Sequence, residues 1–202
     1  MGLDMYFYKT KKIEDFTYKQ IANAPYYFES TSPTEEDYDE AKEFFDLTKE
    51  DIKKIEQSGI TRNSLQEVAY FRKFNALHSW MVNNVQGGVD DCDYYEISRD
   101  QLNELLDTLH KIKETAVLVN WKEVNYPIDE QYKQEIEKYY GDEFKIVKNP
   151  DVCEDLLPTQ DGFFFGWTLY DEYYIESVSE AIDSFERVSL KDDEVLLYSS
   201  SW

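Results

Sequence analysis

Hydrophobic and polar residues alternate at the start of the chain. Leu3, Met5 and Phe7 hold every second position, and more polar side chains lie between them. This period of two is typical of a β-strand that buries one face. We therefore expect the chain to open with a strand whose apolar side contacts the core.

Three later segments space their apolar residues three or four positions apart, which indicates amphipathic helices. They are residues 71–85, 102–112 and 175–188. Ser98 and Gln101 precede the second segment at the spacing of a capping box, in which each side chain binds a backbone N–H of the other residue. We expect these helices, centred on Leu77, Leu105 and Ile182, to cover one face of a small sheet.

Cap residues and short apolar runs predict the remaining elements. Ser32 begins one helix as its cap, before a proline and a glutamate, and Thr48 with Asp51 begins another. A polar helix is expected over residues 129–140, which end at a glycine. Strand patterns occur at residues 94–97, 144–147, 162–166 and 195–198.

The order of these elements shows no regular alternation of strand, helix and strand. That order favours an α+β fold with a small, mainly antiparallel sheet. The 202 residues are enough for one ordinary domain with a substantial core. Because no linker-like segment or internal repeat interrupts the chain, residues 1–202 are expected to form a single domain around one core.

Negative charge dominates the composition. There are 43 acidic and 21 basic residues, and the formal net charge is −22. A chain with this charge repels nucleic acid, so direct nucleic-acid binding is not expected. An aromatic content of 16% argues for a folded protein in spite of the charge. Solubility alone is one explanation of this charge. The alternative is a partner attracted over a distance, which should then carry a basic surface.

Motifs for metals, cofactors and membranes are missing from the sequence. Asp90 and Asp91 are consecutive carboxylates, but they lack the spacing of a calcium loop, and no glycine-rich phosphate loop occurs. Cys92 and Cys153 do not indicate a disulfide framework, and no apolar run reaches membrane-spanning length. We expect no metal, no cofactor, no membrane contact and a cytoplasmic location.

The most unusual segment is residues 149–186, which contain ten acidic residues and no lysine, arginine or histidine. Carboxylates spaced over a folded surface can present a negative potential like that of a phosphate backbone. Aromatic residues lie among these acids, and exposed rings rimmed by charge are typical anchors at protein interfaces. The residues predicted to bind a partner are Asp161, Trp167, Asp171, Glu172, Tyr173 and Tyr174.

A second candidate site is a polar cleft. The polar face of the helix expected at residues 71–85 carries Arg72, Asn75, Ser79 and Asn83. If the two aspartates at positions 90 and 91 fold against this face, a guanidinium, amides and carboxylates meet, as in many polar ligand sites. The predicted ligand-binding residues are Arg72, Asn75, Trp80, Asp90, Asp91 and Tyr170. The alternative is an internal salt bridge from Arg72 to one of the acids.

Cys92 and His78 suggest a third arrangement, a catalytic pair with the thiol as nucleophile and the ring as base. Two acidic residues precede Cys92, and their like charge opposes thiolate formation. His78 follows Leu77 on the apolar stripe, where a buried structural histidine is the more common case. No catalytic residue is predicted.

Several strings resemble an uncharacterised family of small acidic proteins carried by bacteriophages and prophages. They are MGLDMY at residues 1–6, YFRKFNALHSW at 70–80, GVDDC at 88–92, LLPT at 156–159, GFFFG at 162–166 and YDEYY at 170–174. The resemblance implies an accessory protein that acts in the cytoplasm of an infected bacterium. It implies no activity and no catalytic residues.

Two functions are therefore expected from the sequence. The first is binding and inhibition of a host defence protein that handles nucleic acid, through an acidic and aromatic surface that fits a basic groove. The second, from another class, is binding or conversion of a small polar, nucleotide-like ligand in the cleft around Arg72, Asn75, Asp90 and Asp91. Whether the protein is an enzyme stays open, and binding is favoured.

Overall fold

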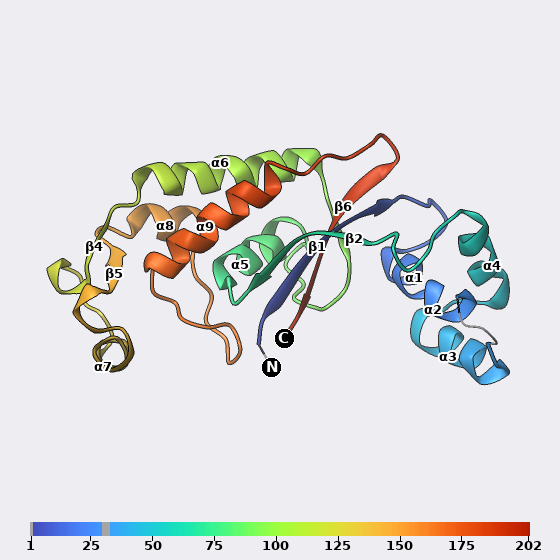
Figure 1. The fold of residues 1–202 in the computed structure, drawn as a ribbon, viewed down its shortest axis with the longest axis horizontal. Helices are drawn as coiled ribbons and strands as arrows, with labels where there is room; N and C mark the ends of the chain where they lie inside the picture. The colour runs from blue at the N-terminus through green and yellow to red at the C-terminus, as the bar shows by residue number, and fades with distance from the viewer. Residues whose placement is uncertain (1, 30–32) are drawn as a thin grey trace.

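The computed structural model describes residues 2–29 and 33–202, and it confirms an α+β fold with an antiparallel sheet. Four strands form the main sheet in the order β2-β1-β6-β3. Their bounds are β1 Asp4–Lys11, β2 Gln66–Arg72, β3 Tyr95–Ile97 and β6 Glu194–Ser201. The first and last strands therefore lie side by side in the middle of the sheet, and both chain ends lie near one another (Figure 1).

The alternation at the start of the chain has the predicted result. Leu3, Met5 and Phe7 are fully buried, whereas the residues between them are partly exposed. The Phe7 ring lies 5.1 Å from the Tyr198 ring on β6 and 4.8 Å from the Phe185 ring above the sheet. The inner face of β1 thus joins the sheet to the helices that cover it.

Four helices lie beside the main sheet (Figure 1). They are α5 (Asn75–Asn84), α6 (Arg99–Thr115), α8 (Asp151–Leu156) and α9 (Glu172–Phe185). Leu77, Leu105 and Ile182 are buried with the inner strand residues in one large cluster, which confirms the three expected helix centres. The capping box of Ser98 and Gln101 is present at the start of α6. Within the described ranges, no helix is long and apolar enough to cross a bilayer.

The N-terminal helices form a cluster of their own at one end of the molecule (Figure 1). They are α1 (Tyr18–Asn23), α2 (Pro25–Phe28), α3 (Glu35–Phe45) and α4 (Lys49–Gln57). Thr48 and Asp51 form the predicted capping box of α4. The cap of α3 is Thr34, which forms a capping box with Asp37, and the expected cap Ser32 lies outside the described residues.

A third apolar cluster lies under the small hairpin of β4 (Leu118–Asn120) and β5 (Lys145–Val147). The segment between these strands contains η1 (Trp121–Glu123), α7 (Glu130–Tyr139) and η2 (Gly141–Glu143). The buried residues of this cluster are Trp121, Ile128, Ile136, Phe144 and Ile146. The buried apolar side chains therefore divide among three clusters, where the sequence led us to expect one core.

Two expected elements were wrong. The segment from residue 71 is not helical throughout, because Phe71 pairs with Met5 in the sheet and α5 begins only at Asn75. Between them Lys73 has a φ of 58°, a left-handed conformation that ends the strand. Residues 162–166 form a turn instead of a buried strand, and Phe163 is 96% exposed in it.

Candidate functional site

Asn75 fixes the loop that follows α8. Its Nδ2 donates to the backbone oxygens of Phe165 at 3.1 Å and Trp167 at 2.8 Å. Its Oδ1 accepts from the backbone N–H of Gln160 at 3.1 Å. The residue is buried, and three hydrogen bonds occupy its amide. Asn75 is therefore a structural clamp for this loop, which corrects its expected role as a free donor to a ligand.

The clamped loop, the β2–α5 turn and the start of α9 enclose a cavity of about 290 Å³, which we call the Arg72 pocket. The turn contributes Arg72 and Lys73, and the loop contributes Trp167. Tyr140 lines the pocket from the end of α7, and Tyr173 lines it from α9. Residues predicted for two different sites, Arg72 of the cleft and Trp167 and Tyr173 of the partner surface, thus meet in one pocket.

Aromatic rings form one wall of the Arg72 pocket. The Tyr140 ring lies 5.4 Å from the Trp167 ring and 5.9 Å from the Tyr173 ring. Tyr132 supports Trp167 from behind at 5.5 Å, and its hydroxyl lies 2.8 Å from the Thr168 hydroxyl. Trp167 is only partly exposed in this wall, so it is not the open surface anchor that the sequence led us to expect.

Two cationic side chains belong to the same pocket. Arg72 keeps 58% of its side chain exposed, and its Nε lies 3.9 Å from Asp4 Oδ1, a long contact. Lys73 makes no ion pair among the residues with described positions. Its backbone lies against Gly166, where an added Cβ would be 3.2 Å from Lys73 Cβ. The two cations are thus held by a tight turn and retain capacity to bind an anion.

Asp171 and Tyr174 lie at the start of α9 and line the pocket, but both are buried. Asp171 Oδ1 caps the helix by accepting from the backbone N–H of Tyr174 at 2.8 Å. Burial raises the pKa of Asp171 to about 6, and the backbone hydrogen bonds oppose that shift. The Tyr174 hydroxyl donates to the Leu157 oxygen at 3.1 Å. Their expected role as exposed partner anchors is therefore corrected to helix capping and packing.

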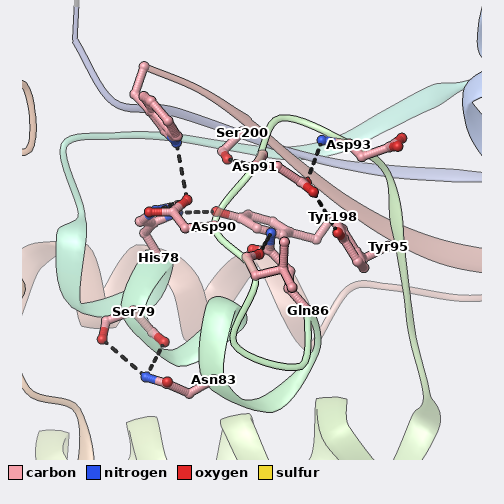
Figure 2. A network of polar contacts seen from close by, with 12 residues as sticks. His78, Ser79, Asn83, Gln86, Asp90, Asp91, Asp93, Tyr95, Tyr198 and Ser200 are labelled. Atoms are coloured by element: carbon pink, nitrogen blue, oxygen red, sulfur yellow. Dashed lines mark hydrogen bonds and ion pairs between the residues drawn. The ribbon is translucent and has the colours of Figure 1, made fainter.

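A separate polar network surrounds His78 (Figure 2). The ring is fully buried, with Nδ1 2.7 Å from the Tyr198 hydroxyl and Nε2 3.1 Å from Asp90 Oδ1. The Asp90 contact is oblique, so Nε2 has no well-aligned acceptor in the described part of the chain. Trp202 Nε1 donates to the same carboxylate oxygen at 3.2 Å. The network therefore joins α5, the following loop and the C-terminal strand.

Burial lowers the pKa of His78, and the nearby Asp90 carboxylate opposes this shift only in part. The ring is consequently neutral near pH 7. A carboxylate at Nε2 favours the proton on that nitrogen, which leaves Nδ1 to accept from the Tyr198 hydroxyl. Burial also raises the pKa of Tyr198, so its hydroxyl keeps the proton that it donates.

Asp91 belongs to the same network and not to the Arg72 pocket (Figure 2). Its carboxylate accepts from the Tyr95 hydroxyl at 2.9 Å and from the Asp93 backbone at 3.0 Å. The expected cleft therefore does not form, because Arg72 and the two aspartates lie at different places. The alternative salt bridge is also absent from the described residues, since the carboxylate contact of Arg72 is with Asp4.

The remaining residues of the expected cleft are structural. Trp80 is 7% exposed and belongs to the large apolar cluster. The Tyr170 hydroxyl accepts from the Thr159 backbone at 3.2 Å, and its ring packs 5.1 Å from the Tyr174 ring. Asn83 donates to the Ser79 oxygen within α5 at 2.9 Å, as Figure 2 shows. None of these polar groups faces Arg72 as expected.

The structure gives no support to a Cys92–His78 pair. Both nitrogens of the His78 ring lie against other groups, and Cys92 is exposed on the loop. Within residues 2–29 and 33–202, no hydrogen bond joins the Cys92 thiol to the ring. Over the same ranges, no group of three histidine, cysteine or acidic side chains is placed to hold a metal ion.

Three packed helices carry many exposed acidic side chains, and we call their exposed faces together the acidic layer. Helix α6 packs against both α8 and α9, and Figure 1 shows the three side by side. Their exposed acidic residues are Asp100, Glu104, Asp107, Glu114, Asp151, Glu154, Asp155, Glu176, Glu180 and Asp183. All exposed basic residues of this layer lie on α6, which contributes Arg99, Lys111 and Lys113. The base-free segment is thus one part of a larger acidic face.

Two of the predicted partner residues, Glu172 and Tyr173, lie in the first turn of α9, at one end of the acidic layer, whereas Asp161 lies on the clamped loop. Tyr173 is 49% exposed, Glu172 is half-buried and Asp161 is exposed on the clamped loop. Phe163, which sequence reasoning placed in a buried strand, is the most exposed large side chain of that loop. Its flanking glycines were the one signal of a turn in place of a strand.

Comparisons with protein-family models, curated proteins and solved structures find no match for this chain. The contacts described above are therefore the basis for any statement about its function. The resemblance to a phage family remains a prediction from the sequence strings.

Proposed function

We propose that the protein binds a host protein with a basic surface through its acidic layer, and so blocks a defence protein that handles nucleic acid. The observation that carries the proposal is the acidic layer itself, whose carboxylates extend over three packed helices. Carboxylates spread over a folded surface can present a negative potential like that of phosphates to a groove built to hold nucleic acid. The net charge of −22 adds long-range attraction to a cationic partner.

Exposed rings supply short-range contacts. Tyr173, which is 49% exposed, lies in the first turn of α9 at one end of the acidic layer, and Phe163, which is 96% exposed, lies on the clamped loop. Exposed aromatic side chains are frequent hot spots because they bury much area with little loss of conformational entropy. Charge thus accelerates the encounter, and the rings stabilise the bound state.

A pull-down from bacterial lysate at increasing salt tests the proposal. An electrostatic complex forms at low ionic strength and weakens as salt shortens the screening length to a few ångströms. Recovery of no specific protein at low salt contradicts the proposal. A partner that stays bound equally well in about 1 M salt contradicts the electrostatic mechanism.

Matched triple variants separate the acidic layer from net charge. Glu154→Gln, Glu176→Gln and Glu180→Gln together remove three exposed carboxylates from α8 and α9. The control removes three exposed carboxylates from α3 by Glu36→Gln, Glu40→Gln and Glu43→Gln. We expect the first variant to lose at least tenfold in partner affinity and the control to lose much less. Equal losses would show that total charge, and not this surface, determines binding.

A further inference from the structure

The Arg72 pocket is lined by side chains of opposite charge. Arg72 and Lys73 bring positive charge to it, in a chain with twice as many acidic as basic residues. Asp171 brings a buried carboxylate. In the described part of the chain no ion pair joins this carboxylate to either cation, so neither charge neutralises the other through direct contact.

Aromatic rings line the pocket together with these charged groups. Trp167, Tyr140 and Tyr173 line the same pocket and contact one another through ring edges and tilted faces. A planar ring that enters such a wall gains stacking contacts with Trp or Tyr. The volume of about 290 Å³ is at the lower limit for small-molecule sites, which suits one ring with one charged group.

The backbone at the pocket is strained on the cationic side. Lys73 is one of two described non-glycine residues with a positive φ, and it lies against Gly166, whose φ is 91°. Such conformations cost free energy and are concentrated at ligand sites, where surrounding contacts hold them. Here the Lys73 backbone N–H donates to the Leu3 oxygen at 2.8 Å, which fixes the turn to β1.

We infer that the Arg72 pocket binds a small ligand of nucleoside monophosphate type, a planar ring that carries a phosphate. Arg72 and Lys73 bind the phosphate through charge-assisted hydrogen bonds, and Arg72 can do so with two parallel donors. Trp167 with Tyr140 and Tyr173 stacks on the ring. Asp171 repels the phosphate from its side of the pocket and so orients the ligand.

This site differs from the cleft that the sequence predicted. Only Arg72 keeps its expected role, because Asn75 clamps the loop and the two aspartates lie in the His78 network. The inference depends on the pocket alone and not on the acidic layer. An experiment that contradicts one of the two proposals therefore does not contradict the other.

Thermal melting with AMP, GMP, adenosine and inorganic phosphate at millimolar concentration tests the inference. A ligand that binds the native state raises the melting temperature. We expect a mononucleotide to raise it more than adenosine or phosphate alone, because only the nucleotide satisfies both parts of the pocket. No shift with either nucleotide overturns the inference, and an equal shift with phosphate alone overturns the assignment of the ring wall.

Variants assign the binding to named residues. Arg72→Gln and Lys73→Asn each remove one cation, and asparagine tolerates the left-handed backbone at position 73. Each should weaken nucleotide binding about tenfold, whereas Arg72→Lys should retain part of the affinity. The matched control is Arg187→Gln, which removes an exposed arginine beyond α9 and should leave binding unchanged. If the control variant loses as much affinity as Arg72→Gln, bulk charge explains the binding and the site is wrong.

Fluorescence provides a readout that folding defects do not mimic. Stacking on Trp167 should quench its emission upon nucleotide addition. Trp167→Phe should abolish the quenching yet retain nucleotide-dependent thermal stabilisation in part. Quenching that persists in this variant overturns the placement of the ring.

Discussion

The polar residues before and after helix α5 lie in two regions of opposite character. After the helix, the buried His78 ring is in contact with other protein groups, the Tyr198 hydroxyl at Nδ1 and the Asp90 carboxylate near Nε2. Before the helix, Arg72 and Lys73 line an open pocket, and Lys73 has no ionic partner among the described residues. The sequence predicted one cleft that contains residues of both regions. In the structure, the first region is an internal polar network and the second lines a pocket.

The difference shows how burial decides what a polar residue can do. A buried polar group must find its partners within the protein, because an unpaired one costs free energy, and it then has little capacity for a ligand. A half-exposed cation stays hydrated at little cost in free energy, and it can therefore bind an anionic ligand. We therefore expect mutations in the His78 network to change stability and mutations in the Arg72 pocket to change binding.

Replacement of His78 should have the largest effect on stability. His78→Ala leaves a cavity and removes the acceptor of the buried Tyr198 hydroxyl. We expect a loss of about 3–4 kcal/mol in the free energy of unfolding, measured by urea titration. His110→Ala is the matched control, because that ring is 45% exposed and its contact is with an exposed glutamate, Glu186. A similar loss in both variants would contradict the comparison.

Replacement of Asp171 by asparagine should increase the stability of the protein near neutral pH. Because burial raises its pKa from 3.8 to about 6, the folded chain holds the proton more tightly than the unfolded chain. The resulting stabilisation is present below pH 3.8 and is lost as pH rises through about 6. Asp171→Asn keeps a good helix cap without the buried charge.

At pH 7.5 we expect the free energy of unfolding of Asp171→Asn to exceed that of the wild type by about 1–3 kcal/mol. The difference between the two proteins should shrink as pH falls from 7.5 towards 4. Thermal melting across this range measures it. A constant difference at all pH values would show that the carboxylate does not titrate as the burial implies.

Gly166 offers the smallest and most local test of the pocket. Gly166→Ala places a Cβ 3.2 Å from Lys73 Cβ at a φ of 91°. Gly59→Ala is the control, with a φ of 83° and no atom within 4 Å of the added Cβ. Both should lose about 1–2 kcal/mol of stability through the backbone, but only Gly166→Ala should also weaken nucleotide binding. Equal binding by both variants would show that the Lys73 turn does not shape the site.

Local signals in the sequence predicted much of the fold. Alternation placed β1, and the capping boxes at Ser98 and Thr48 placed the starts of α6 and α4. The errors arose where the position of an apolar residue fits both the helical spacing and the strand spacing. Phe71 lies three positions before Phe74 and so extends the helical stripe, although pairing with β1 makes it part of a strand.

The candidate site was harder to predict because its parts are distant in the chain. The Arg72 pocket joins the β2–α5 turn to residues near position 170, through hydrogen bonds from Asn75 to Phe165 and Trp167. No local pattern records such a contact. The sequence did identify Arg72, Trp167 and Tyr173 as unusual, but it assigned them to different sites.

The sheet order also determines how the chain must fold. Asp4 pairs with Ser201, so the central strand pair closes a loop of nearly the whole chain. Helices α1 to α4 make contacts mainly with one another and can form early, whereas β1 must wait for β6. Before β6 has paired with β1, one edge of β1 lacks its backbone hydrogen bonds and can pair with a strand of another molecule. From the same arrangement that places both chain ends together, we expect slow folding whose yield depends on protein concentration.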